Sequence, residues 1–416
     1  MSHVSSEKWL AQLGFWKNPF AETDANRERK LVPNLFVACD GYDSILGNET
    51  VCVAGPRGSG KTAIQIQLAS QLAPIRPDSC ILAVECTEPP SQLGQLLHNS
   101  SSAIAYHVHW LLYWGVKALL DAVADGPNAA PRKGDGETRQ HHRSRPAEQL
   151  HSSQHLAFAQ LIRKYHPELL QPLELWERLQ RMGVSLPTDQ PLSDMEIRNT
   201  FSVDVHEQKL RIFMGNRLDD DPGVRLLVNL VDARVSATTT AAGSHDDLRR
   251  LQQLAEAAGY ETIHFLVNDL DIEPCTHGTG TDLDVFLTVF KRLQVDGVVY
   301  KIFLTAESCE EASRLHRLLP DNRVVISWRE PGLKHLLDTR LGAYSCGKCH
   351  NLAQLSETQT VGEGIEREMI IQAHGSPRRL LNAGQCLVQA HVDQGQTDLL
   401  SWEDWLSAKQ ALDTRA

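Results

Sequence analysis

The sequence lacks any long uninterrupted apolar run. Its longest apolar region, residues 103–123, is broken by His107, His109, Lys117 and Asp121. The uncharged stretch that remains is shorter than the roughly 20 apolar residues that a membrane-spanning helix needs. We therefore expect no membrane span, and we interpret this region as a buried helix or a surface that binds a partner.

Basic residues are also in deficit. Lys and Arg number 41 against 52 Asp and Glu, so the formal net charge is -11 and the sequence pI is near 5.9. Nucleic-acid binding depends on clustered Lys and Arg that neutralise phosphates. The net charge therefore does not support a nucleic-acid partner. Residues 126–145 hold a local excess of Arg and Lys, which we interpret as a solvated loop; contact with nucleic acid or an acidic partner is the alternative.

Closely spaced cysteines are scarce. Of nine cysteines only Cys346 and Cys349 lie near each other, and the start of the chain lacks the basic-then-apolar layout of an export signal. We expect a reduced, cytoplasmic protein. The CGKCH run matches a haem-attachment pattern of exported chains, and with His350 or Cys386 it offers zinc ligands, but no second pair has zinc spacing. An incidental turn is the alternative.

The composition of the 416 residues is otherwise ordinary for a globular protein. Apolar runs at 49–55, 79–90, 223–233, 262–271 and 297–307 alternate with helical patterns, among them 246–260 and 282–295. Such alternation predicts a parallel sheet flanked by helices, an α/β three-layer sandwich. The segments we expect are an N-terminal lead (1–40), the first half of the core (41–125), a flexible loop (126–146), a helical insertion (147–215), the second half of the core (216–330) and a C-terminal helical lid (331–416).

The run GPRGSGKT at residues 55–62 fits the phosphate-binding pattern GxxxxGK[ST], between an apolar strand and an amphipathic helix. Its glycines allow backbone N–H groups to turn toward phosphates, and the helix N-terminus behind them favours negative charge. The sequence therefore predicts a P-loop, or Walker A motif, that binds ATP. Lys61 would contact the outer phosphates and Thr62 would ligate Mg²⁺. The predicted binding residues are Gly55, Pro56, Arg57, Gly58, Ser59, Gly60, Lys61, Thr62 and Ala63.

A P-loop enzyme also needs a carboxylate at the end of a neighbouring strand, to hold the metal and orient water. Asp269 and Asp271 follow the strand expected at 262–267, and Asp269 is a candidate metal ligand beside Thr62. The register, however, puts Asn268 in the usual metal-ligating position, and Ile272 rather than an acid follows Asp271. Because an amide is a weaker ligand and cannot act as a base, a nucleotide-binding scaffold without turnover is an alternative to an ATPase.

These landmarks resemble the bacterial AAA+-like and STAND-type P-loop ATPases, including those with an origin-recognition-like helical lid. The resemblance rests on the NPF run near the start, the GPRGSGKT loop, the LVNDLD strand and the GSPRRLL run near the end. It implies a parallel α/β sandwich with a C-terminal helical lid. It also implies that the NPF run covers the adenine, and so adds to the binding residues Asn18, Pro19 and Phe20.

The same resemblance assigns roles to four further residues. Thr305 is similar to the sensor-1 residue after a core strand, and Arg378 is similar to the sensor-2 arginine that reaches the γ-phosphate; with Asp269 and Asp271 these are the predicted catalytic residues. Arg329 and Arg340 lie where such proteins often place an arginine that contacts a neighbour's nucleotide, and a packing ion pair is the alternative for both.

The function predicted is an ATP-dependent molecular switch or assembly ATPase, in bacterial signalling or defence, with an unidentified protein partner or self-assembly. A DNA-associated AAA+ ATPase of the origin-recognition or transposition type is the alternative.

Overall fold

The computed structural model describes residues 5–72, 81–86, 103–125, 152–166, 244–268, 287, 289–290, 292–308, 310, 322–395 and 398–414. Several sequence-based expectations therefore lie outside the described residues: the loop at 126–146, most of the insertion at 147–215, the strand at 223–233, and the carboxylates Asp269 and Asp271. The chain divides into two compact units. Unit 1 comprises Met1–Gln71, Val267–Glu273 and Lys301–Ala416, and unit 2 comprises Leu72–Leu266 and Pro274–Tyr300.

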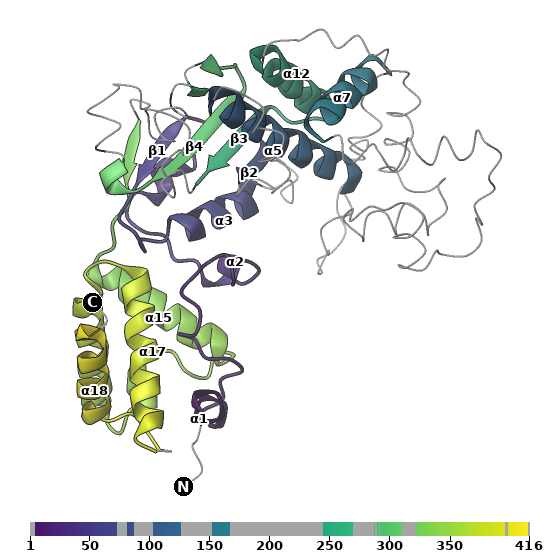
Figure 1. Cartoon of the computed structure of the whole chain (residues 1–416). Helices are drawn as coiled ribbons and strands as arrows, with labels where there is room; N and C mark the ends of the chain where they lie inside the picture. The colour runs from purple at the N-terminus through teal and green to yellow at the C-terminus, as the bar shows by residue number, and fades with distance from the viewer. Residues whose placement is uncertain are drawn as a thin grey trace, which may run out of the picture. The chain divides into compact units, whose positions relative to one another are not determined.

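The expected parallel α/β sheet is confirmed. It has five strands in the order β2-β3-β4-β1-β5, and Figure 1 shows β1 and β4 side by side. Four strands lie in the expected apolar runs: β1 (Val51–Ala54), β2 (Ile81–Cys86), β3 (Thr262–Val267) and β4 (Val298–Leu304). The sequence analysis missed β5 (Arg323–Val325), because three residues with an exposed-buried-exposed pattern give too short a signal.

Strands β1 and β4 are buried along their whole length, as expected for the middle of a parallel sheet. Their register pairs Val51 with Lys301 and Ala54 with Leu304. The residues that follow these two strands therefore emerge at the same edge of the sheet. Ala54 also pairs with Val325 of β5, which places β1 between the two strands.

The strand order creates a switch point between β1 and β4. From β1 the chain continues to β2 at one end of the sheet, whereas from β4 it continues past β1 to β5 at the other end. In open α/β sheets, ligands bind in the crevice outside the carboxyl ends of strands at such a point. The segment directly after β1 is the glycine-rich run at 55–62, which leads into helix α3 (Lys61–Leu72).

Among its described residues, unit 2 contains the helices α5 (Ala103–Asp125), α7 (Ser152–Tyr165) and α12 (Ser244–Ala257). Helices α7 and α12 are joined by Asp247, which accepts hydrogen bonds from Lys164 Nζ at 2.5 Å and from Tyr165 Oη at 2.8 Å. The buried-helix interpretation of 103–123 is confirmed by Leu111 and Leu112, which are almost fully buried. In the part of the chain that the structure describes, no helix is both long and apolar enough to cross a membrane.

In unit 1, a group of helices follows β5: α15 (Glu330–Tyr344), η3 (Leu352–Leu355), α16 (Gln359–Ala373), α17 (Pro377–Asp393) and α18 (Trp402–Asp413). Helices α16, α17 and α18 are capped at their N-termini by Thr358, Ser376 and Ser401, whose hydroxyls accept a backbone N–H of the first turn. The N-terminal lead contains α1 (Ser6–Gln12), α2 (Val32–Leu35) and η1 (Tyr42–Ile45). Its apolar side chains share one hydrophobic core with these helices, among them Trp9, Leu10, Phe15 and Phe20.

Candidate functional site

The loop at 55–62, here called the glycine loop, needs glycine at three positions. Gly58 and Gly60 have φ angles of +81° and +93°, in the left-handed region that side chains rarely adopt. At Gly55 an added Cβ would lie 2.5 Å from Ile326 Cγ1, so only glycine fits between the loop and the segment after β5. The loop is therefore a built structure and not an incidental run of small residues.

The Lys61 side chain folds back over the glycine loop. Its ammonium donates hydrogen bonds to the carbonyl oxygens of Gly55 at 2.9 Å and Pro56 at 3.2 Å. Lys61 is also the first residue of α3, so its charge adds to the positive end of that helix dipole. The arrangement concentrates donors and positive charge at the carboxyl end of β1.

Two further carbonyl oxygens of the glycine loop accept hydrogen bonds from the C-terminal part of the chain. Trp328 Nε1 donates to the Ser59 carbonyl at 2.8 Å. The Arg378 backbone N–H and the Ser376 hydroxyl donate to the Gly58 carbonyl, at 3.3 and 3.4 Å. The start of α17 is therefore bonded directly to the loop.

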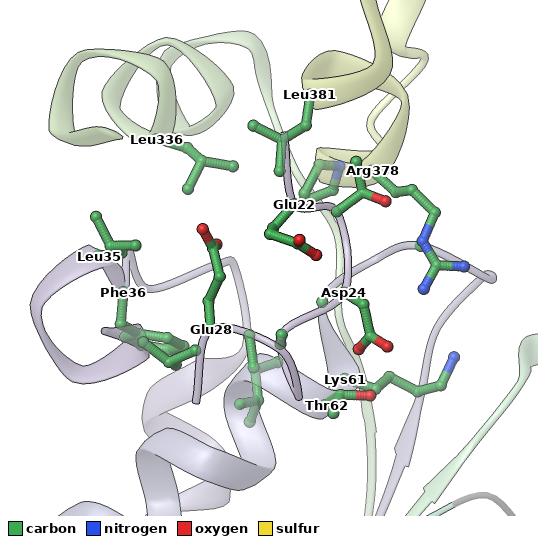
Figure 2. A pocket seen from close by; sticks show the side chains of 18 of the residues that line it. Glu22, Asp24, Glu28, Leu35, Phe36, Lys61, Thr62, Leu336, Arg378 and Leu381 are labelled. Carbon is green, nitrogen blue, oxygen red and sulfur yellow. The ribbon is translucent and has the colours of Figure 1, made fainter. Parts of the chain in front are cut away.

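A cavity of about 500 Å³ opens over the glycine loop, and all its lining residues belong to unit 1. Figure 2 shows Lys61, Thr62 and Arg378 on one side of the cavity, with Leu35, Phe36 and Leu336 on the other. We call these the cationic side and the apolar side. Arg57, Gly58 and Gly60 of the glycine loop also line the cavity, as do Val32, Val37 and Leu381. A ligand with an anionic end and a flat apolar end matches this division.

Three carboxylates of the N-terminal lead also line the cavity: Glu22, Asp24 and Glu28. In Figure 2 the Asp24 carboxylate faces Lys61 and Thr62, and its Oδ1 accepts the Asn26 backbone N–H at 3.0 Å. Hard oxygen donors of this kind suit a divalent cation bound beside phosphates.

Glu28 forms a buried ion pair with Arg340 of α15 at 2.8 Å, and both side chains are under 10% exposed. The Tyr344 hydroxyl donates to the other Glu28 oxygen. Burial and this hydrogen bond raise the pKa of Tyr344, so the hydroxyl keeps its proton. Arg340 also donates to the Pro19 and Glu22 carbonyls. The ion pair ties the lead to α15 along one wall of the cavity.

Asn268 directly follows β3 and lies beside the end of the glycine loop. Its Nδ2 donates a hydrogen bond to Thr62 Oγ1 at 3.2 Å, and the residue is only 6% exposed. Strand β3 ends at Val267, where the apolar run was expected to set its register, so Asn268 is the first residue after the strand. The described residue that bonds Thr62 at the end of β3 is therefore a neutral amide.

The other two predicted catalytic residues that the structure describes, Arg378 and Thr305, differ in their position relative to the cavity. Arg378 lines the cavity. Thr305 follows β4, but it is not among the described residues that line the cavity; its hydroxyl donates to Ser308 Oγ at 2.8 Å and accepts the Ser308 N–H at 3.1 Å. Thr305 thus caps the turn that follows β4.

The residues of the NPF run are likewise not among the described residues that line the cavity, although the Pro19 carbonyl bonds Arg340 of its wall. Asn18 Oδ1 accepts the Phe20 N–H at 2.9 Å, and Phe20 is buried against Gly384 of α17. The lead residues that do line the cavity begin a few positions later, at Glu22. In the described structure the run turns the chain and anchors the lead, and the cavity wall comes from its continuation.

The two candidate arginines for contact with a neighbouring copy differ. Arg340 lies inside the chain's own cavity wall, in the packing ion pair that was the alternative interpretation. Arg329 is 82% exposed at its side chain and bonds Asp40 at 3.0 Å.

The CGKCH run is a turn after α15. Cys349 is buried, and burial raises the pKa of its thiol to about 11, which disfavours the thiolate that metals bind. Across the described ranges, no group of three or more His, Cys, Asp or Glu side chains could hold a metal ion.

Several residues that line the cavity were not predicted from the sequence, including Asp24, Glu28, Phe36, Trp328 and Leu336. No motif marks them, because they come from the lead, α2 and α15 and meet only in the folded chain. Comparison with protein-family models and with curated proteins gives no match to this chain.

Proposed function

We propose that this chain binds ATP with Mg²⁺ at the glycine loop and acts as a nucleotide-dependent switch or assembly ATPase of the AAA+/STAND-like class. The observation that carries the proposal is the position of the glycine loop. It has two left-handed glycines, its last two residues, Lys61 and Thr62, begin α3, and it lies at the switch point of a parallel sheet. These are the features that a P-loop uses to bind phosphates.

The charges along the cavity support a polyphosphate ligand. Lys61, Arg57 and Arg378 line the cavity, so three positive side chains surround the loop. A phosphate that reaches the loop would replace the Gly55 and Pro56 carbonyls as the acceptor of the Lys61 ammonium. Charge-assisted bonds to phosphate oxygens are stronger than bonds to neutral carbonyls, so the exchange favours binding.

The apolar side supports a nucleoside at the other end of the ligand. Leu35, Leu336 and Leu381 offer aliphatic surface to a flat base, and Phe36 offers a ring. A cavity of about 500 Å³ lies within the range of pockets that enclose molecules of nucleotide size. The Glu28–Arg340 pair at the wall provides both hydrogen-bond acceptors and donors.

The residues present fit Mg²⁺ through oxygen donors. Thr62 Oγ1 would hold the ion, and the Asp24 carboxylate faces the same region in Figure 2. When bound, the ion would neutralise charge on the outer phosphates. Asn268 orients the Thr62 hydroxyl through the bond between them.

A switch function is supported by the contacts between the loop and the C-terminal helices. Ser376 and Arg378, at the start of α17, donate to the Gly58 carbonyl, and the Arg378 side chain lines the cavity. A ligand that bonds Arg378 therefore bears directly on the position of α17. A nucleotide switch requires a ligand that interacts differently with two conformations, and Arg378 offers such a contact at the start of α17.

A nucleotide-binding scaffold without turnover is the second candidate, and Asn268 is the observation that favours it. A neutral amide beside Thr62 cannot accept a proton from water, so the end of β3 offers no general base at this position.

Equilibrium titration with ATP and measurement of phosphate release test the two candidates together. ATP binding that Lys61→Ala abolishes supports the common site. Phosphate release above that of Lys61→Ala then identifies an ATPase, and release equal to that variant identifies the scaffold. Wild-type protein that binds no ATP would refute both.

A further inference from the structure

Trp328 occupies the short connection between β5 and α15, three residues after the end of the strand and two before the start of the helix. Its indole is half-buried at the edge of the cavity, and its Nε1 donates a hydrogen bond of 2.8 Å to the Ser59 carbonyl. A residue of the connection to the C-terminal helices therefore holds a carbonyl of the glycine loop.

This bond fixes the orientation of one peptide group of the loop. In a planar trans peptide the carbonyl oxygen and the following N–H point in opposite directions. With the Ser59 carbonyl held toward Trp328, the Gly60 N–H points away from the indole. Gly60 lines the cavity and has a φ of +93°. Since glycine has access to many backbone conformations, this peptide depends on an outside contact to keep one orientation.

Two glycines of the C-terminal part of the chain lie close to Trp328, one near its indole and one near its backbone. An added Cβ at Gly332, in the first turn of α15, would lie 3.4 Å from Trp328 Cε3. An added Cβ at Gly375, just before α17, would lie 3.3 Å from the Trp328 carbonyl oxygen. Trp328 thus lies between the glycine loop and the starts of two C-terminal helices.

We infer that Trp328 is a positioning residue for phosphate binding, which sets the Ser59–Gly60 peptide so that its N–H is available to the phosphates. This role rests on the proposed function. In this role the Trp328 indole does not contact the base of the nucleotide. The effect of losing the indole N–H should therefore depend on the phosphates of the ligand and not on its nucleoside.

The test is Trp328→Phe, which keeps a ring for packing and removes the N–H donor. Loss of one hydrogen bond predicts that the Kd for ATP and for inorganic triphosphate rises about three- to tenfold. The Kd for adenosine, measured by competition, should stay within about twofold of wild type. A general loss of structure would weaken all three ligands together.

Trp16→Phe is the matched control. The Trp16 indole also donates to a carbonyl, that of Ala343 at 3.2 Å, but Trp16 is 56% exposed and is not among the described residues of the cavity. Its affinities should equal those of wild type. Unchanged ATP affinity in Trp328→Phe, or equal weakening for ATP and adenosine, would overturn the positioning role while leaving ATP binding intact. Wild-type protein that binds neither ATP nor triphosphate would overturn the proposed function itself.

A measurement on the wild-type chain covers the case in which Trp328→Phe does not fold. With 5-fluorotryptophan at all eight Trp positions, inorganic triphosphate should shift at least one ¹⁹F resonance and adenosine should leave that resonance in place. The absence of any resonance that responds to triphosphate would contradict the coupling between Trp328 and the loop.

Discussion

Asn268 donates a hydrogen bond to the hydroxyl of Thr62 across 3.2 Å, which joins the end of β3 to the end of the glycine loop. The two residues are 206 positions apart in the sequence. Within the proposed function, this amide occupies the position where a P-loop ATPase needs a carboxylate.

Asn268→Asp replaces that amide with a carboxylate of the same size. Within the proposed function it should raise ATP hydrolysis by about tenfold or more, because a carboxylate ligates Mg²⁺ water and can accept a proton. Phosphate release is the measurement, with ATP affinity determined separately. Asn268→Ala is the control and should show no increase. A rate that does not respond to Asn268→Asp would mean that this position does not limit turnover.

The Glu28–Arg340 pair should stabilise the lead against α15. Arg340→Met leaves Glu28 buried without its cation and is expected to lower the free energy of unfolding by about 3 kcal/mol. Urea unfolding measures the change. Lys334→Met breaks the more exposed Lys334–Glu366 contact of the same helix and should cost less than about 1 kcal/mol. Equal losses in the two variants would argue against a structural ion pair at Glu28.

Gly384→Ala should destabilise the chain, although alanine is normally the better helix residue. An added Cβ at position 384 would lie 2.3 Å from Phe20 Cδ1, so the lead must move away from α17. We expect a loss of about 1–3 kcal/mol, as for other overpacked cores, measured by thermal unfolding. The double variant Phe20→Leu with Gly384→Ala should recover part of the loss. Higher stability in Gly384→Ala would refute the close contact.

Lys301 at the start of the β1–β4 pairing predicts a specific pH dependence. Its ammonium donates to the carbonyls of Gly47 and Glu49, and burial lowers its pKa from 10.5 to about 8. Between these two values the unfolded chain holds the proton and the folded chain does not, so the free energy of unfolding gains a contribution that rises with pH.

Lys301→Met removes this contribution. The stability of wild type relative to Lys301→Met should therefore increase between about pH 8 and 10.5, by an amount on the order of 3 kcal/mol. Because wild type and Lys301→Met share all other titratable groups, the difference between their stabilities at each pH cancels the contribution of those groups. A difference that stays constant over this interval would show that Lys301 titrates normally.

Sequence patterns located the elements whose signals are local. One continuous stretch of sequence predicted strand β1, the glycine loop and α3. The apolar run of β3 predicted that Asn268 directly follows the strand, as observed. The cavity wall could not be located in this way. Glu28 and Arg340 are 312 positions apart, and no sequence pattern around either residue indicates that the two form an ion pair. The NPF run illustrates the same limit, because its neighbour Gly384 became apparent only in the folded chain.

The most direct test of ATP binding is thermal unfolding of wild type, Lys61→Ala and Lys30→Ala, each with and without Mg²⁺ and ATP. Lys30 is an exposed lysine that is not among the described residues of the cavity. At ATP one hundred times above Kd, binding adds about 2.7 kcal/mol of stability. ATP binding at the glycine loop predicts this stabilisation in wild type and Lys30→Ala and its loss in Lys61→Ala. No stabilisation in wild type, or an equal stabilisation in Lys61→Ala, would contradict it.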